Sequence, residues 1–321
     1  MLKYTLKRIG AMVPVMLIIS VVVFLIIYLT PGDPASSMLG MEASADQIER
    51  VNESLGLNEP LPQRYLEWMG GVLTGDLGDS YFMHQPVTQA IAEHFGPTLS
   101  LAILAQLIAL LIALLIALPC GVIAALKHGS RTDAVLRVVA LLGVAIPGFL
   151  MALMLMWLFA VTLRVLPVAG YAPLSKGWFV HLRYLALPAI SLGCVQAALL
   201  MRMTRASVIE AMQLDCVKTA RAKGVSEVRV VLSHALRNAA LPILTSVGYS
   251  FGALITGAVV TEAIFNIPGL GQLVTSSIER RDYPVIQGVL LVIALLNSVI
   301  NLLVDLAYGA FDPRARKWGD A

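Results

Sequence analysis

Six long stretches of this chain contain no Asp, Glu, Lys or Arg, and every charged residue falls outside them. Each stretch has at least 18 residues, which at 1.5 Å per residue is long enough to span a hydrocarbon core of about 30 Å. The pattern predicts an all-α integral membrane protein. Its six transmembrane helices are expected at about 9–30, 98–126, 136–163, 184–203, 239–262 and 284–308.

The amino-acid composition supports the prediction of a membrane protein. Apolar residues make up 58% of the 321 residues, charged residues 13%, and the mean hydropathy is +0.81, whereas a soluble domain carries about 25% charge. One membrane domain over 1–321 is expected. The basic residues do not gather into a patch that fits nucleic acid. Three scattered cysteines form neither a disulfide framework nor a zinc site; they are Cys120, Cys194 and Cys216.

The first apolar run has two interpretations. It follows Lys3, Lys7 and Arg8, an arrangement that also begins secretory signals. However, the run is longer than the roughly 7–15 apolar residues of a signal, and it ends at Pro31-Gly32-Asp33-Pro34 rather than at a small-residue cleavage site. A retained helix is therefore favoured.

The division of basic residues between alternate loops predicts the orientation. With the N-terminus inside, 16 Lys and Arg residues lie on the cytoplasmic side and seven on the other. Because such residues concentrate on the cytoplasmic side, both termini are expected inside. Three residues of one outer loop run against the rule: Arg164, Lys176 and Arg183.

The loop 33–94 holds ten acidic residues and two basic ones, Arg50 and Arg64. Ser44 and Gln47 have the spacing of a capping box, and the helix that they begin is expected to stop at Gly56. A second helix is expected from Pro62, with an apolar stripe formed by Tyr65, Trp68, Met69, Val72 and Leu73. Both helices are expected to pack on the membrane ends or on a partner.

The acidic excess of this loop fits a solvated outer face. It also fits a docking surface for an external protein, or a funnel for a cationic solute. His84, His94 and His181 are predicted outside as well. Since they lack the i,i+4 spacing of a helical metal site, surface positions are favoured over metal ligands.

A helical hairpin is expected at 204–240, between two membrane helices. Its first apolar stripe is Ile209, Met212, Cys216 and Ala220, and its second is Val228, Val231, Leu232, Ala235 and Ala239. Gly224 separates the stripes, and Ser226 is a predicted N-cap followed by Glu227. Such a hairpin either lies on anionic lipid headgroups or passes the motion of a soluble partner into the membrane.

Eight short motifs resemble the dipeptide, oligopeptide and nickel permease subunits of ATP-binding cassette importers. They are Gly-Asp-Pro at 32–34, Gly-Asp-Leu-Gly-Asp-Ser at 75–80, Thr-Arg-Ala-Ser at 204–207, Thr-Ala-Arg-Ala-Lys-Gly at 219–224, His-Ala-Leu-Arg-Asn-Ala-Ala-Leu-Pro at 234–242, Pro-Gly-Leu-Gly at 268–271, Arg-Asp-Tyr-Pro-Val-Ile-Gln at 281–287 and Asn-Leu-Leu-Val-Asp-Leu at 301–306. The resemblance runs from the first predicted helix to the last.

This resemblance implies a multi-pass subunit of the bacterial inner membrane with the type I importer permease fold. It implies pairing with a second homologous permease, two cytoplasmic ATPases, and a solute-binding protein outside that is either periplasmic or lipid-anchored. ATP and magnesium would be bound by the ATPases, so no cofactor and no enzymatic activity are expected in this chain. Consistent with that, the sequence contains no Gly-x-x-x-x-Gly-Lys-Ser/Thr motif.

The resemblance also implies that the hairpin carries an EAA-type motif with Gly224 at its turn and a coupling helix at about 226–236. The residues expected to couple this chain to the ATPase are Lys218, Ala220, Gly224, Val225, Ser226, Glu227, Arg229, Val230, His234 and Arg237. The sequence departs from the general motif, because Lys218 stands where Glu is expected and Leu241-Pro242 comes late after Gly224. A salt bridge from Lys218 to a partner is therefore not assumed.

Polar residues at membrane depth must find partners or face a wet cavity. The candidates for a translocation path are Gln106, Gln196, Ser246, Tyr249, Ser250 and Asn297. Gly248, Gly252 and Thr256 have the four-residue spacing of a close-packed helix seam. Kinks or helix ends are expected at three prolines: Pro119, Pro147 and Pro188.

The solute stays open at this stage. Di- or oligopeptides come first, and glutathione and nickel or a nickel chelate are alternatives. A stand-alone secondary transporter or an intramembrane enzyme is the rival class, but it usually shows charged or catalytic groups at membrane depth, and the six runs contain no Asp, Glu, Lys or Arg.

Overall fold

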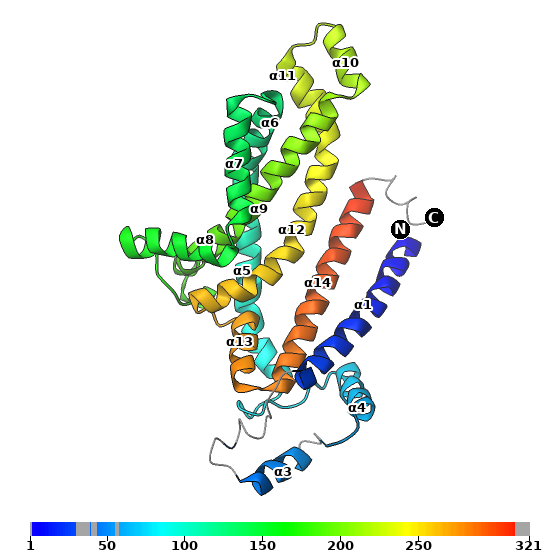
Figure 1. The fold of residues 1–321 in the computed structure, drawn as a ribbon, viewed down its shortest axis with the longest axis vertical. Helices are drawn as coiled ribbons and strands as arrows, with labels where there is room; N and C mark the ends of the chain where they lie inside the picture. Colours follow the sequence, from blue (N-terminus) through cyan, green and yellow to red (C-terminus); the bar gives the residue numbers. More distant parts are fainter. Residues whose placement is uncertain (1, 30–38, 40–43, 55–57, 312–321) are drawn as a thin grey trace. The chain divides into compact units, whose positions relative to one another are not determined.

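The computed structural model describes residues 2–29, 39, 44–54 and 58–311, and within these ranges the chain folds into helices (Figure 1). The one extended pairing among these residues is an isolated bridge between Asp79 and Pro86. The chain divides into two compact units, residues 1–98 with 268–321 and residues 99–267. The single membrane domain expected over 1–321 stays a prediction.

The first unit contains α1 (Leu2–Leu29), α3 (Ala45–Ser54), α4 (Leu61–Thr74), the start of α5 (Val87–Ile112), α13 (Leu270–Arg280) and α14 (Tyr283–Phe311). Its core joins apolar residues of α5 to those of α13 and α14, among them Val87, Leu273 and Val289. Helices α1 and α14 lie side by side in Figure 1, and Arg8 and Asp305 form an ion pair of 2.8 Å between them.

The expected helices between the first two membrane helices are present. The backbone N–H of Ser44 donates to Gln47 Oε1 at 2.9 Å, which confirms the capping box. The expected stop at Gly56 and the motif at 32–34 lie outside the described residues. Helix α4 packs on α1, because Tyr65 hydrogen-bonds Ser20 at 2.8 Å and its ring lies 5.4 Å from that of Phe24. Leu73 is 81% exposed and lies off the face of α4 that packs within this chain, whereas the other members of its predicted stripe are half-buried.

Two motifs of the sequence meet in the first unit. The Ser80 hydroxyl donates to one oxygen of the buried Asp282 carboxylate, and the Tyr81 N–H donates to the other at 3.2 Å. The Ser80 oxygen also accepts from the Met83 N–H at 2.9 Å. The Gly-Asp-Leu-Gly-Asp-Ser loop is thereby attached to the turn between α13 and α14.

The second unit contains the rest of the chain. In order it comprises the end of α5, the π-helical η1 (Ala113–Ala117), α6 (Leu118–Leu126), α7 (Arg131–Ala145), α8 (Gly148–Leu155), the π-helical η2 (Met156–Thr162), the 3-10 turn η3 (Leu174–Lys176), α9 (Trp178–Met212), α10 (Asp215–Ala222), α11 (Glu227–Arg229), the π-helical η4 (Val230–Ala235) and α12 (Leu236–Phe265).

Four described helical segments are long and apolar enough to cross a membrane, and the number rises to seven if each of three bent helix pairs is one span. The four are Thr5–Leu25, Val87–Leu126, Trp178–Met212 and Tyr283–Leu306. The second begins within the predicted loop 33–94. Pro86 immediately precedes the first turn of α5, a position that favours the start of a helix. The first charged residue of α5, Glu93, is exposed, so its charge does not interrupt the helix.

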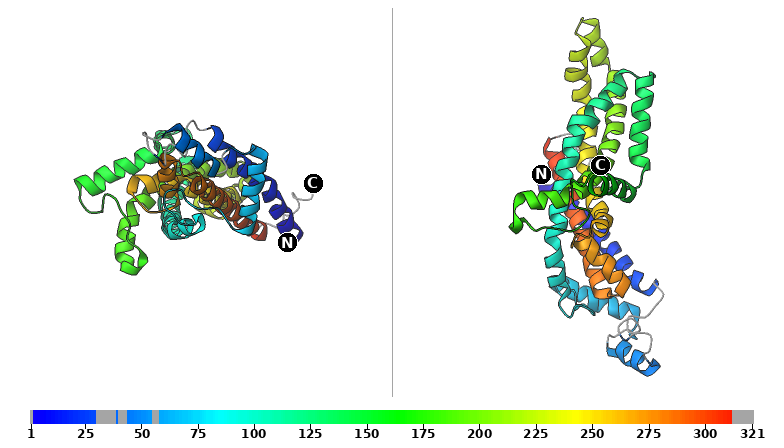
Figure 2. Two further views of the ribbon diagram at one scale, coloured as in Figure 1. Left: turned by 90° about the horizontal axis from the view of Figure 1, so that it is seen from below. Right: turned by 90° about the vertical axis from the view of Figure 1, so that its left-hand side faces the viewer.

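The predicted span 136–163 is not one straight helix. Residues 131–145 and 148–162 are bent by 99° from each other, and Figures 1 and 2 show α8 turned away from α7. Pro147 lacks the N–H that would continue α7, and it holds Ile146 in an extended conformation with ψ 120°. The expected break at Pro147 is confirmed, whereas Pro188 lies inside the uninterrupted α9.

Glycines bring neighbouring helices of the second unit close together. A Cβ at Gly193 of α9 would lie 3.2 Å from the Ala109 backbone of α5, and one at Gly143 of α7 would lie 2.6 Å from the Ala198 Cβ. In lipid, the hydrophobic effect does not drive helices together, so their association depends on close packing. Small residues permit that close approach of the helix backbones.

Replacing Gly193 by Val is expected to lower the stability of the solubilised protein by about 1–3 kcal/mol, the usual cost of overpacking. The matched control is Gly10→Val, because no atom lies within 4 Å of a Cβ at Gly10. Thermal unfolding in detergent is the measurement. Equal unfolding temperatures for the two variants would contradict the close contact.

Candidate functional site

The hairpin 204–240 is an ordered extension of α9 and α12 (Figure 1). Gly224 has φ +75°, its N–H donates to the Arg221 carbonyl at 2.9 Å, and the Val225 N–H donates to the Ala220 carbonyl at 3.2 Å. Arg221 also reaches across the turn to Glu227, with its Nε 2.7 Å from the carboxylate. The glycine turn is confirmed, and it needs the left-handed conformation that favours glycine.

The apolar stripes of the hairpin belong to the same core as the ends of the membrane helices. Val217 of α10 and Val230 of η4 are fully buried, and they cluster with Val208 and Ala211 of α9 and with residues of α6, α7 and α12. Ser226 stands at the N-cap of α11 as predicted, but its side chain makes no capping hydrogen bond. Packing on α9 therefore holds the hairpin more firmly than its caps do.

The predicted stripes are partly wrong. Cys216 is exposed and Val217 takes its place in the core. Val231, Ala235 and Ala239 are buried as expected, whereas Val228 is 70% and Leu232 is 59% exposed. Residues 230–235 form a π-helix, whose i→i+5 bonding places more residues in each turn than the α-helical period assumes. Leu232 lies within this π-helix and faces outward, and Val228, which precedes it in α11, is also exposed.

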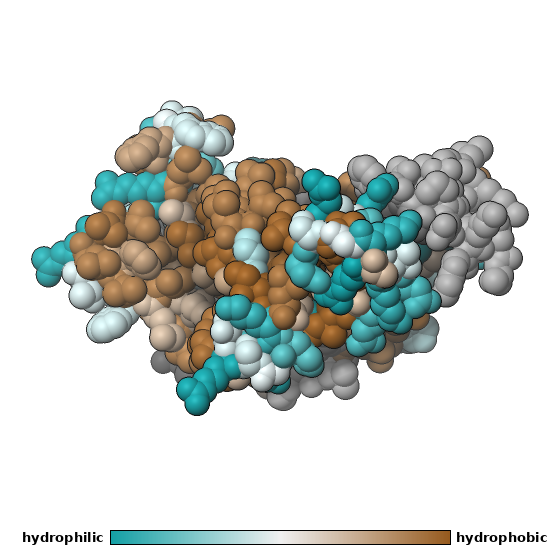
Figure 3. Space-filling model, turned by 90° about the horizontal axis from the view of Figure 1, so that it is seen from above, coloured by the Kyte–Doolittle hydropathy of each residue, from teal (hydrophilic) through white to brown (hydrophobic). Residues whose placement is uncertain are grey.

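The residues predicted to meet an ATPase divide into three groups by their exposure. Ala220 and Val230 lie in the core, where they hold the hairpin together. Val225 and His234 are half-buried, and the exposed members are Lys218, Gly224, Ser226, Glu227, Arg229 and Arg237. Figure 3 looks onto this end of the molecule, where teal hydrophilic residues gather over the hairpin with brown hydrophobic residues between them.

Lys218 is engaged within the chain. Its ammonium donates to Asp215 at 2.9 Å and holds the pKa of that exposed carboxyl below its usual range. The sequence reasoning missed Val228 and Leu232 as surface residues. The available signal was a pair of large apolar residues spaced four apart on a charged hairpin, which the sequence pattern places on the second apolar stripe.

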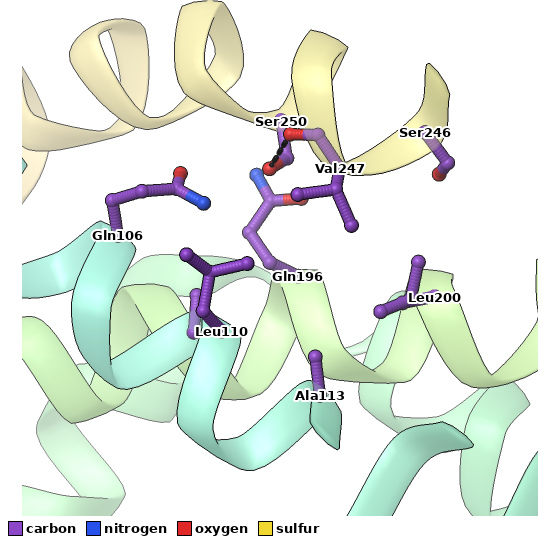
Figure 4. A pocket seen from close by; sticks show the side chains of 9 residues that line it. Gln106, Leu110, Ala113, Gln196, Leu200, Ser246, Val247 and Ser250 are labelled. Atoms are coloured by element: carbon purple, nitrogen blue, oxygen red, sulfur yellow. Dashed lines mark hydrogen bonds between the residues drawn. The ribbon is translucent and has the colours of Figure 1, made fainter. Parts of the chain in front are cut away.

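Four of the six predicted path residues line one pocket in the second unit (Figure 4). Gln106 comes from α5, Gln196 from α9, and Ser246 and Ser250 from α12; apolar residues of these helices and Ala113 of η1 complete the lining. About 10 Å³ is open to the centre of a water molecule, which is room for about one water. The structure therefore places four polar side chains around a small pocket whose lining is otherwise apolar.

Gln106 is the most buried of these polar residues. Its side chain points toward Gln196 in Figure 4, it is only 3% exposed, and its Oε1 has no hydrogen-bond partner among the described residues. The Ser250 hydroxyl donates back to the Val247 carbonyl at 2.6 Å. The side chain of Tyr249 lies outside the described part, and Asn297 belongs to α14 of the first unit.

The predicted packing seam is only partly buried. Gly252 is buried and Gly248 is half-buried, but Thr256 is exposed. The next residue, Gly257, makes the contact with α9, since a Cβ there would lie 3.0 Å from Leu192. Thr256 consequently lies outside the seam that α12 makes within this chain.

The histidines do not gather. His181 is 6% exposed and its Nδ1 lies 2.7 Å from the Ala172 carbonyl, so its predicted surface position is wrong. Among the described residues, no group of three or more His, Cys, Asp or Glu side chains is placed to hold a metal ion.

The family model described as binding-protein-dependent transport system inner membrane component matches residues 117–317, and the model for the N-terminal part of such membrane components matches residues 1–102. This chain belongs to that family. It is a multi-pass protein of the inner membrane and the permease subunit of an importer rather than its ATPase. The rival class of stand-alone secondary transporters is thereby excluded.

Similar proteins cover nearly the whole chain. A probable peptide ABC transporter permease of Sinorhizobium fredii is 40% identical, covering 98% of this chain and 99% of that protein. A putative peptide transport permease of Brucella abortus is 44% identical, covering 97% and 98%. A glutathione transport permease of Pectobacterium atrosepticum is 42% identical, covering 98% and 99%.

A solved amino acid ABC transporter is 18% identical, with a TM-score of 0.48, and covers 71% of this chain and 94% of that chain.

Single cysteines at positions 228 and 232 are expected to react quickly with a hydrophilic maleimide in the solubilised subunit, and cysteines at 217 and 230 slowly. The reason is that only the first two side chains are exposed. The native cysteines must first be replaced, since Cys216 is exposed. Equal labelling rates at 230 and 232 would contradict the burial of Val230 and the exposure of Leu232.

Proposed function

We propose that this chain forms the translocation path for short peptides together with a second, homologous permease. Two cytoplasmic ATPases dock beneath the permease pair, one of them on the hairpin of this chain, and a periplasmic or lipid-anchored binding protein delivers the solute from the other side. Both termini and the hairpin lie in the cytoplasm, as the 16 Lys and Arg residues of that side favour. ATP and magnesium are bound by the ATPases, and this chain carries no cofactor.

The observation that carries the coupling role is the hairpin's construction. One face shares a core with four helices of the second unit, while Val228 and Leu232 are exposed among charged residues. An apolar pair that stays mostly exposed in the folded subunit is stabilised by burial against a partner, at roughly 25 cal/mol per Å² of apolar surface. A groove in the ATPase is the proposed partner, and the rigid base of the hairpin transmits its movement.

The polar pocket supports the peptide assignment. Its polar lining consists of amides and hydroxyls, which pair with peptide N–H and C=O groups without selecting for charge. Such a lining suits solutes that share a backbone and differ in their side chains. The glutamines of α5 and α9 point toward each other at this pocket, and separation of these helices would admit the solute between them.

Glutathione is the second candidate, because one of the similar permeases is named for it. Uptake of a labelled dipeptide, labelled glutathione and nickel should be compared in a strain that lacks this gene and in the complemented strain. Complementation that restores dipeptide uptake supports the proposal, restoration of glutathione uptake alone favours the second candidate, and restoration of neither organic solute contradicts both.

Cysteines placed singly from Ser226 to Leu236 are expected to cross-link to an ATPase in a periodic pattern. Positions 228 and 232 should give the strongest products, and positions 230, 231 and 235 should give little, since those native side chains are buried. Cross-linking in native membranes followed by electrophoresis is the measurement. A series without any ATPase adduct would refute docking at the hairpin.

Gly224→Val is expected to reduce transport and solute-stimulated ATP hydrolysis while the subunit still inserts. No atom lies within 4 Å of a Cβ at Gly224, so the cost is backbone strain at φ +75°, about 1–2 kcal/mol. Gly224→Asn is the matched control, because asparagine tolerates this conformation better. If Val and Asn variants transport equally, the turn geometry does not matter for coupling.

A further inference from the structure

A fully buried carboxylate lies in the first turn of α7. Asp133 has no exposed surface, and its oxygens accept from Arg205 Nε at 2.7 Å and Nη2 at 2.9 Å. The Gly129 N–H donates to the same carboxylate at 3.0 Å. The guanidinium therefore binds with two parallel hydrogen bonds, the strongest geometry for this pair.

Two further basic side chains, Arg137 and His128, lie beside the Asp133–Arg205 ion pair. Arg137 lies one turn along α7, with its Nε 3.5 Å from the carboxylate. His128 Nδ1 lies 3.0 Å from Arg205 and 3.5 Å from Asp133. The Arg205 side chain is only 18% exposed. An ionised carboxylate removed from water needs such complete compensation.

The pair joins segments that are far apart in the sequence. Asp133 holds the turn between α6 and α7, since its own N–H donates to the Ser130 cap at 3.3 Å and its carboxylate binds the Gly129 N–H. Arg205 belongs to α9. The helices also approach closely here: a Cβ at Gly121 of α6 would lie 2.8 Å from the Met201 carbonyl of α9.

The position of Arg205 connects this pair to the hairpin. It lies about two turns before α9 ends at Met212, and α10 begins at Asp215. Val208 and Ala211, between Arg205 and that end, share an apolar cluster with Val217 of α10 and Val230 of η4. The segment from Arg205 to the hairpin is thus packed without a break.

We propose that Asp133 and Arg205 are positioning residues of the coupling step. Their ion pair fixes the turn between α6 and α7 to α9, so that α6, α7, α9 and the hairpin move as one body when the ATPases move. Apolar packing alone allows helices to slide past each other. An ion pair with two parallel hydrogen bonds fixes both the distance and the angle between the two segments that it joins. The inference rests on the proposed function, because it assigns the motion to docked ATPases.

The test uses the complete transporter in proteoliposomes with its binding protein, and alanyl-alanine and glutathione as solute probes. Basal and solute-stimulated ATP hydrolysis are measured for Asp133→Asn, Arg205→Gln and the double variant. The ratio of stimulated to basal hydrolysis is expected to fall about threefold to thirtyfold in each single variant. The double variant should lose no more than either single one, because both remove the same interaction.

The matched control is the ion pair Arg8–Asp305 of the first unit. Arg8→Gln and Asp305→Asn also remove one charge each, and they are expected to keep the wild-type ratio. Arg205→Lys keeps the positive charge but loses the planar guanidinium that binds a carboxylate with two parallel hydrogen bonds. It keeps the test decisive if the other variants fail to assemble. It should assemble normally and show a ratio between those of wild type and Arg205→Gln.

Assembled Asp133 and Arg205 variants with the wild-type ratio would overturn the inference. It would also be overturned if basal and stimulated hydrolysis fell together, in step with a lower unfolding temperature, because the pair would then serve stability only. A wild-type complex whose ATP hydrolysis responds to neither solute would overturn the proposed function, and the inference with it.

Discussion

The contact between the hairpin and the end of α9 is the interaction on which the functional account depends. Val217 and Val230 are fully buried in a core that continues into α6, α7, α9 and α12. A flexible loop would have no such core. Because protein interiors are close-packed and transmit strain, force applied at Val228 or Leu232 passes into the membrane helices instead of being lost in a flexible connection.

Sequence reasoning predicted the features that lipid and backbone chemistry determine locally. Runs without charge located the four unbroken membrane spans, Gly224 located the turn, and Pro147 located a break, since each effect acts within a few residues. The predictions failed where tertiary structure intervenes. The π-helix at 230–235 shifted the apolar stripe, and α5 began before the charge at Glu93 because that side chain lies on the exposed face.

The polar groups of the second unit illustrate the same division. Gln106, Gln196, Ser246 and Ser250 were selected only because they are polar at membrane depth, and the structure brings all four to one pocket. The Asp133–Arg205 pair was not predicted, because its members are 72 residues apart and each resembles an ordinary loop charge in the sequence. Long-range pairing of charges has no local signature, whereas the cost of placing polar groups in lipid does.

The central claim, that the hairpin moves together with the membrane helices, is tested most directly by a distance measurement. Spin labels at the native Cys216 and at a cysteine replacing the exposed Arg131, with Cys120 and Cys194 replaced, report the distance between the hairpin and the turn preceding α7. Pulsed electron paramagnetic resonance on the assembled transporter should give the same narrow distribution in nucleotide-free and ATP-bound states. A distribution that shifts or broadens when ATP binds would contradict the account.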